Sequence, residues 1–157
     1  MSEAAYRPCV GILILNQAGQ VFVGQRVDQV VEAWQPPQGG IDPGEEPLAT
    51  ALRELGEETG IAANKVELIA ATQHELLYDL PEELAGRVWK GKWRGQRQRW
   101  FLFRFLGEDG DIDIATEHQE FRAWRWVAPH EIVDLAVDFK RQLYVDVLAA
   151  FAGHLPQ

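Results

Sequence analysis

Apolar residues in the first part of the chain are grouped into short runs that predict a β-hairpin. Residues 10–15 form a continuous apolar run of strand length, which is typical of a strand covered on both faces. Turn-forming residues follow at 16–19, and residues 20–26 are predicted to be the returning strand. The segment 27–34 is irregular, and the prolines and glycines of 35–40 exclude a regular helix or a central strand there.

A helix is predicted to follow the turn at 42–44. Pro47 is tolerated in a first helical turn, where its missing N–H costs nothing, and Gly60 is suited to the C-terminal end. Acidic residues at 45 and 46 favour the positive end of the helix dipole. Apolar residues then recur at helical spacing and predict one buried stripe, formed by Leu48, Ala51, Leu52 and Leu55.

The second half of the chain predicts further strands and a C-terminal helix. The strand-like segments are 66–73, 98–106 and 120–127, and a long polar and basic connection runs through residue 95 between the first two. A short helix is expected within 129–135, and 138–152 shows the spacing of an amphipathic helix. This mixed order, without internal repeats, predicts one α+β sandwich domain spanning residues 1–157.

Composition fits a small folded cytoplasmic protein. The chain has 157 residues, of which 46% are hydrophobic, and this is enough to bury an ordinary core. The only cysteine, Cys9, adjoins an apolar run, so we expect a buried, reduced thiol and no disulfide within the chain. There is no secretory signal and no apolar segment near the roughly 20 residues that span a membrane. We infer no membrane association and no obligate protein partner.

Charge is unevenly distributed. The net charge is −9, yet the stretch 87–107 has no acidic residue. Seven of the fifteen lysines and arginines lie in this stretch: Arg87, Lys90, Lys92, Arg94, Arg97, Arg99 and Arg104. Such a strip can attract one particular anion on an otherwise acidic protein, and the alternative is a solvated surface loop.

The predicted helix after Pro47 carries a cluster of carboxylates. Glu54, Glu57 and Glu58 recur at i, i+3 and i+4 on the surface that the apolar stripe leaves free. One interpretation is a solvated acidic face that Arg53 partly neutralises. The other is a site for Mg²⁺ or Mn²⁺, which prefer oxygen ligands, and the chain has no Cys/His cluster suited to zinc. The glycines at 39 and 40 would allow a metal or a phosphate to approach the backbone.

The spacing of these residues resembles the signature of the Nudix hydrolases. Gly39, Glu45 and the run 53–61 match the nine fixed positions of the Nudix box over residues 39–61. The resemblance implies an α/β/α sandwich with a mixed β-sheet, and hydrolysis of a nucleoside diphosphate linked to another group. It implies that Glu54, Glu57, Glu58 and the Gly39 carbonyl bind the divalent metal, while Arg53 supports catalysis by bracing the box together with Glu45. A non-catalytic nucleotide or RNA sensor on the same scaffold would have lost these carboxylates.

The resemblance extends to the Nudix branch that acts on RNA 5′ ends and on dinucleoside polyphosphates such as Ap₄A. It rests on the segments 6–8, 34–41, 78–81, 95–101, 120–127 and 139–141. By resemblance, Glu120 supplies a further metal ligand. The implied phosphate contacts are Arg7, Tyr78, Gln96 and Lys140, and the implied base contacts are Arg26, Val137 and Phe139. Without the resemblance, Arg7 and Lys140 would be surface cations, Tyr78 a half-buried packing residue, and Trp100 and Phe101 parts of the core.

Two substrates remain open at this point. One is the 5′-triphosphate end of RNA, from which pyrophosphate would be removed. The other is Ap₄A, because the connection 82–95 resembles the branch that hydrolyses it. Either reaction requires an attacking water whose proton goes to a helix glutamate or to a carboxylate elsewhere.

Overall fold

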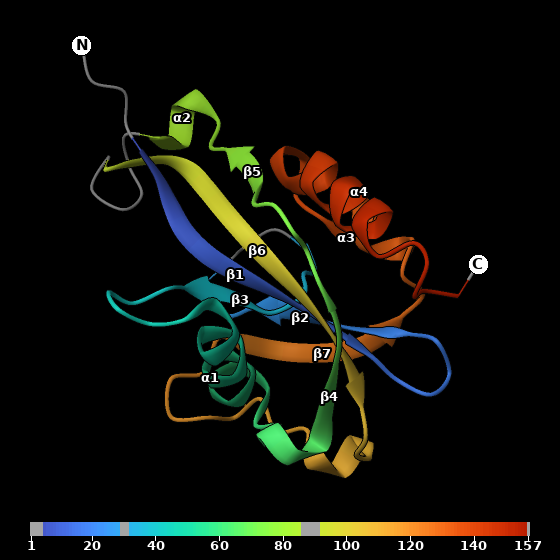
Figure 1. Ribbon diagram of the computed structural model, residues 1–157. Coiled ribbons are helices and arrows are strands. Elements are labelled where there is room, and N and C mark those ends of the chain that lie inside the picture. The colour runs from blue at the N-terminus through green and yellow to red at the C-terminus, as the bar shows by residue number, and fades with distance from the viewer. Residues whose placement is uncertain (1–4, 29–31, 86–91, 157) are drawn as a thin grey trace.

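The protein is built on one mixed β-sheet, which the computed structural model describes over residues 5–28, 32–85 and 92–156 (Figure 1). The strands in these ranges are β1 (Ala5–Leu15), β2 (Val21–Arg26), β3 (Gln38–Gly40), β4 (Val66–Ala71), β5 (Leu76–Asp79), β6 (Trp93–Phe105) and β7 (Phe121–Val127). Their order across the sheet is β4-β6-β1-β2-β7, with β3 paired to β1 and β5 paired to β6. The predicted hairpin of β1 and β2 is confirmed.

Helices cover both faces of this sheet and confirm the α/β/α sandwich. The longest, α1 (Pro47–Thr59), lies on one face, and α3 (Glu131–Leu135) and α4 (Arg141–Ala150) lie on the other (Figure 1). The short elements are α2 (Glu82–Ala85) and the 3₁₀ turns η1 (Ala63–Lys65), η3 (Asp109–Asp111) and η4 (Asp138–Lys140). Among the described residues, none of these helices has the length and apolar character needed to cross a membrane.

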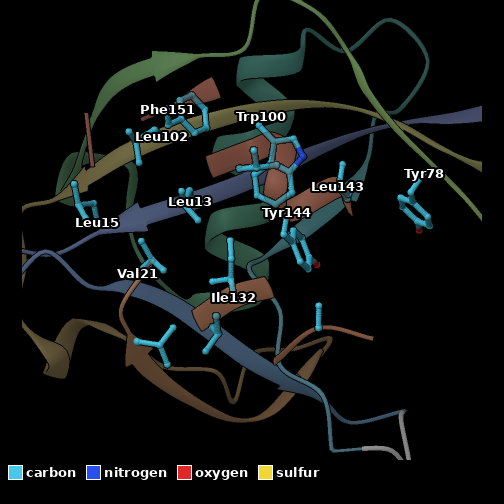
Figure 2. Packing of buried hydrophobic residues seen from close by; sticks show 14 residues of the cluster. Leu13, Leu15, Val21, Tyr78, Trp100, Leu102, Ile132, Leu143, Tyr144 and Phe151 are labelled. Atoms are coloured by element: carbon cyan, nitrogen blue, oxygen red, sulfur yellow. The ribbon is translucent and has the colours of Figure 1, made fainter. Parts of the chain in front are cut away.

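Alternation along the central strands divides the apolar side chains between two cores. On β1, Leu13 and Leu15 face α3 and α4, whereas Ile12 and Ile14 face α1. The next strand, β6, sends Trp100 and Leu102 into the first core and its phenylalanines into the second. Figure 2 shows the first core, in which side chains from the sheet meet those of α4. Full burial on both faces explains why residues 10–15 are apolar without interruption.

The parallel pairing of β1 with β6 brings together residues that are far apart in the sequence. The register runs from Ala5 opposite Trp93 to Leu15 opposite Arg104, and it places Arg7 directly opposite Gln96. The first half of β6 also pairs with β5, and its second half pairs with β4. Polar side chains that are distant in sequence therefore lie next to one another at the N-terminal ends of these strands.

The structure corrects several element boundaries. β1 begins at Ala5 rather than at residue 10, and β6 begins at Trp93 rather than at residue 98, so the connection through residue 95 is partly strand. It also contains β5 and α2, and the segment 35–40 ends in the short strand β3. The first residues of β1 and β6 are more polar than the rest of these strands, so the apolar runs begin later than the strands do. Residues 86–91 of the connection, including Arg87 and Lys90, lie outside the described residues.

The acidic helix begins and ends where the sequence predicts. α1 starts at Pro47, and Gly60 ends it in the left-handed conformation with φ of 72°. Ala51 and Leu55 are fully buried, but Leu48 is 38% exposed, so the predicted stripe is one residue too long at its N-terminal end. Ala49 is exposed as well, so the core begins to cover the helix only at Thr50.

A glycine on β1 makes room for the largest buried side chain of the first core. A Cβ added at Gly11 would lie 2.1 Å from indole carbon Cε2 of Trp100. We predict that Gly11→Ala lowers the free energy of unfolding by about 1–3 kcal/mol, because a packed indole cannot move aside without strain. Urea denaturation measures this change. Gly110→Ala is the matched control, since a Cβ there meets no atom within 4 Å, and equal midpoints for the two variants would contradict the prediction.

Candidate active site

The three glutamates of α1 differ sharply in their exposure to solvent. The Glu57 side chain is 49% exposed and that of Glu54 is 14% exposed, whereas Glu58 is 1% exposed. The prediction that all three lie on the free surface of the helix is therefore wrong for Glu58. Its position, three residues after Leu55, turns it toward the sheet at the edge of the buried face of α1.

Arg53 ties the acidic cluster to the loop before the helix. Its guanidinium donates two hydrogen bonds to Glu45, from Nε at 2.8 Å and from Nη2 at 2.9 Å. It also donates to Glu54 Oε1 at 2.9 Å, to Glu57 Oε2 at 3.2 Å and to the Gly40 carbonyl at 3.2 Å. The hydrogen bonds from Arg53 lower the pKa of Glu45 to about 2. The arginine thus links the loop before the helix to two of its glutamates, Glu54 and Glu57.

Glu58 has a buried carboxylate whose hydrogen-bonding capacity is not satisfied within the described part of the chain. Both of its carboxylate oxygens are buried, and neither has a hydrogen-bond donor among the described residues. Burial raises the pKa of Glu58 well above its ordinary value, and the neighbouring carboxylates of Glu54 and Glu120 raise it further. A buried carboxylate without a partner costs several kcal/mol, so this position calls for a cation.

The surroundings of Glu58 fit a divalent metal ion. A Cβ added at Gly39 would lie 2.1 Å from the carboxyl carbon of Glu54, so the backbone of β3 packs directly against that carboxylate. Carboxylate and carbonyl oxygens without sulfur or imidazole are the ligands of hard cations. Within the described ranges, no three acidic, His or Cys side chains already converge on one point, since Arg53 holds Glu54 and Glu57. Glu54, Glu57, Glu58 and Gly39 could hold the ion.

Glu120 reaches the same cluster from the start of β7. It raises the pKa of Glu58, and its Oε2 lies 3.6 Å from Nη2 of Arg26. Arg26 also donates two hydrogen bonds to Asp28, from Nε at 2.8 Å and from Nη2 at 2.7 Å. The structure therefore places Arg26 between two carboxylates, and its implied contact with a base remains a prediction.

A cavity of about 320 Å³ opens beside the acidic cluster. Its lining includes all four implied phosphate contacts and two of the three implied base contacts: Arg7, Tyr78, Gln96, Lys140, Arg26 and Phe139. Gly39 lies in the wall that this cavity shares with the carboxylates. Val137, the third implied base contact, is not part of the lining. Four lining residues were not predicted from the sequence to contact the substrate or the metal: Asp28, Gln38, Leu80 and Leu84.

Lys140 is a buried cation and not the surface residue that its type alone suggests. It is 9% exposed, donates to Gln38 Oε1 at 3.3 Å and lies 5.3 Å from the centre of the Tyr78 ring. Burial, together with the smaller effect of the nearby Arg26, lowers the pKa of Lys140 to about 8. Among the described residues it forms no ion pair, so an anion in the cavity would relieve its desolvation. Tyr78 is likewise buried, at 7% exposure, rather than half-buried.

A row of glutamines behind the cavity was only partly anticipated from the sequence. Gln98 is fully buried and bonds to both Gln96 and Gln38, which line the cavity. The sequence signal was present as two glutamines at alternate positions in an otherwise aromatic strand. Trp100 and Phe101, at 0% and 3% exposure, belong to the core as expected.

The basic stretch is less basic in the folded protein than in the sequence. Arg94 lies 3.4 Å from Asp79, Arg97 lies 2.5 Å from Glu75, and Arg104 lies 4.0 Å from Glu67. The acidic partners come from β4, β5 and the turn between them. This pairing favours the solvated-surface interpretation for these three arginines, because neighbouring carboxylates offset their charge.

Comparison with known proteins identifies the family of this chain. The NUDIX domain model matches residues 5–147, and the chain belongs to the Nudix family. The RNA pyrophosphohydrolase of Sphingopyxis alaskensis is 60% identical over 146 residues, covering 93% of this chain and 92% of the relative. The RNA pyrophosphohydrolase of Roseobacter denitrificans is 56% identical over 155 residues, covering 99% of this chain and 97% of the relative.

Solved structures agree in fold at much lower sequence identity. The dihydroneopterin triphosphate pyrophosphohydrolase of E. coli superposes with a TM-score of 0.72 at 22% identity, covering 92% of this chain and 98% of its own. A binary complex of the C. elegans Ap4A hydrolase superposes with a TM-score of 0.67 at 23% identity, covering 94% of this chain and 98% of its own. These similarities show that the sandwich is shared.

The arrangement suits cleavage of a phosphoanhydride bond. Phosphoryl transfer depends on positioning and on neutralising charge, and less on covalent chemistry. When bound, a divalent cation would polarise a phosphate oxygen and lower the pKa of a water molecule. The cations of Arg7 and Lys140 would draw the phosphate chain into the cavity, and Arg53 would keep the carboxylates in place.

We predict that Glu57→Gln abolishes most turnover while the protein stays folded. An amide has nearly the shape of a carboxylate but is a poor ligand for a hard cation, so the barrier should rise by roughly 3–5 kcal/mol. The fold should persist because this side chain is half exposed and loses a like-charge repulsion. Measurement of kcat with Mg²⁺ and of circular dichroism tests both parts. Glu67→Gln, an exposed acid on β4, is the control, and near-wild-type kcat in Glu57→Gln would refute the metal-binding role.

Proposed function

We propose that this protein is a Mg²⁺-dependent hydrolase that removes pyrophosphate from the 5′-triphosphate end of RNA. The observation that carries the proposal is the shared wall at Gly39, with a carboxylate cluster on one side and a cavity containing a buried lysine on the other. Mg²⁺ is the ion proposed, and Mn²⁺ offers similar ligand chemistry. The names of the two bacterial relatives support this choice of substrate.

The cavity supplies the groups that a triphosphate chain requires. Arg7, Gln96 and Lys140 line it and would contact the phosphates, together with Tyr78. Its volume of about 320 Å³ lies at the lower end of the range for small-molecule sites, so it would take the phosphates and part of a nucleotide rather than an extended RNA. The rest of the RNA would remain outside the cavity.

An aromatic pair provides a place for a base. The rings of Phe139 and Tyr78 lie 5.8 Å apart at an angle of 36°, and both line the cavity. Phe139 is partly exposed, whereas Tyr78 is buried behind it. Because every base has a π face, an exposed ring can stack a base without reading its identity. This arrangement supports a substrate with a second nucleotide.

Ap₄A is the second candidate substrate, and one feature of the cavity favours it. Leu84, from the helix α2 in the connection after β5, forms part of the lining. The connection that resembles the Ap₄A branch therefore helps to shape the site. Ap₄A also offers a polyphosphate with a second nucleoside, so one cavity could accept either molecule.

Direct competition decides between these substrates. Triphosphorylated RNA and Ap₄A are supplied at equal concentration with Mg²⁺, and the products are separated. The proposal expects release of pyrophosphate and a 5′-monophosphorylated RNA as the faster reaction. Clear preference for Ap₄A, with the RNA untouched, would overturn it and leave the second candidate.

We predict that Phe139→Ala lowers kcat/KM for triphosphorylated RNA by about tenfold or more. Stacking of a base on an aromatic ring contributes roughly 1–3 kcal/mol, and a mononucleotide has no second base to stack. Hydrolysis of a mononucleotide should therefore hardly change. Phe139→Leu, which keeps apolar bulk beside Tyr78, separates stacking from packing and should lose nearly as much activity on RNA. Equal losses on RNA and on a mononucleotide would contradict a base-stacking role.

A further inference from the structure

The indole N–H of Trp100 points from the core toward the glutamines that lie behind the cavity. Trp100 is fully buried, and its Nε1 donates a hydrogen bond to Gln98 Oε1 at 2.8 Å. The indole packs directly against the backbone of Gly11, where a side chain would overlap it. It also makes a perpendicular contact with the ring of Tyr144, with ring centres 6.0 Å apart (Figure 2). An indole nitrogen donates and never accepts. The amide oxygen of Gln98 must therefore face Trp100.

This constraint passes to the two glutamines beside Gln98. With its oxygen fixed, Gln98 presents its Nε2 in the opposite direction, where it donates to Gln96 Oε1 at 2.7 Å and to Gln38 Oε1 at 3.1 Å. Both neighbours must therefore turn their oxygens toward Gln98. The indole N–H thus fixes the direction of the Gln98 amide, and the amides of Gln96 and Gln38 are aligned with it.

Gln38 and Gln96 differ in how firmly their direction is fixed. The oxygen of Gln38 also accepts from Lys140 at 3.3 Å, and its nitrogen donates to the Tyr144 hydroxyl at 3.3 Å, so it is held independently. Gln96 makes its side-chain hydrogen bond, within the described residues, to Gln98 alone. The orientation of the Gln96 amide therefore depends on that of Gln98, which is fixed by its hydrogen bonds with Trp100 and Gln38.

Gln96 lines the cavity, so its orientation decides what the cavity offers. With its oxygen toward Gln98, its NH₂ group is the end left for a ligand, and this group suits an anion. A reversed amide would direct a carbonyl oxygen at the same place and repel a phosphate. Gln96 can therefore donate a hydrogen bond to a phosphate in the first orientation but not in the reversed one.

We propose that Trp100 and Gln98 are positioning residues that keep the NH₂ group of Gln96 directed at the phosphates of the substrate. The inference rests on the proposed function in that it takes a polyphosphate as the ligand of this cavity. It applies equally to RNA 5′-triphosphate and to Ap₄A. Neither positioning residue needs to touch the substrate.

The test begins with Trp100→Phe, which removes the N–H and keeps an aromatic ring in the core. Gln98 Oε1 then has no donor, and only the hydrogen bonds from Gln98 Nε2 to Gln38 and Gln96 still oppose a reversal of its amide, which would reverse Gln96 with it. We expect KM, and the dissociation constant of inorganic triphosphate measured by calorimetry, to rise about tenfold or more, with kcat within about twofold of wild type. Trp126→Phe is the matched control, because it also loses an indole hydrogen bond, to Asp109 at 2.9 Å, but packs against the other core, on the α1 face of the sheet. Its KM should not change.

A double-mutant cycle separates positioning from general damage to the core. If Trp100 acts through the Gln96 amide, then Trp100→Phe has no further effect on KM or on triphosphate binding in a Gln96→Leu background. Equal effects in both backgrounds, or unchanged triphosphate binding in Trp100→Phe, would overturn the proposal. The cycle is measured on both RNA and Ap₄A, so a wrong choice of substrate is recognised separately from a failure of the positioning role.

Gln98→Glu provides a second variant that keeps Trp100 and its packing. A carboxylate accepts from Trp100 and also from an NH₂ group of Gln96, so it draws that amide into the reversed orientation. The expected result is again weaker triphosphate binding with nearly unchanged kcat, even if Trp100→Phe does not fold. Binding at the wild-type level in Gln98→Glu would contradict the proposal.

Discussion

Burial of the Glu58 carboxylate is the constraint around which the site is arranged. Its two oxygens have no donor among the described residues, and the carboxylates of Glu54 and Glu120 lie close by. Such a group destabilises the fold unless a cation compensates it. The neighbouring structure keeps this need in place: the Cβ-free backbone at Gly39 packs on Glu54, and Arg53 fixes the direction of the other helix carboxylates. The fold thus keeps an uncompensated buried carboxylate at the position where a metal ion would bind.

On the other side of Gly39, the cavity contains a buried cation, Lys140. Lys140 is buried without an ion pair in the described structure, and it shares the cavity with Arg7. One side therefore requires a cation and the other an anion, and a metal-bound polyphosphate satisfies both. The parallel β1–β6 pair makes this proximity possible, because its register sets Arg7 beside Gln96 at one end. Its central residues meanwhile fill two apolar cores that hold the strands rigid. The first of these cores also buries the indole of Trp100, which we propose orients the glutamines of the cavity through Gln98.

The sequence predicted the parts of this structure that follow local rules. Helix α1 could be placed because a proline, a glycine and a 3.6-residue period agree, and the spacing of the glutamates identified the acidic cluster. The burial of Glu58 was missed although position 58 continues the spacing of Ala51 and Leu55, because a carboxylate is not expected in a buried stripe. The starts of β1 and β6 were missed because the residues near Arg7 and Gln96 are polar and lie outside the apolar runs. The burial of Lys140 and the role of Gln98 depend on contacts between elements far apart in sequence.

Thermal unfolding with and without Mg²⁺ is the most direct test of whether the buried carboxylate requires a cation. A ligand that binds the folded protein at a hundred times its dissociation constant contributes roughly 2.7 kcal/mol, which should raise Tm of wild type by about 5 °C or more. Glu58→Gln, measured in EDTA and in Mg²⁺, should lose most of this difference, because the group that demands the cation is gone. A Tm of wild type that Mg²⁺ leaves unchanged, or an equal increase in Glu58→Gln, would contradict the account.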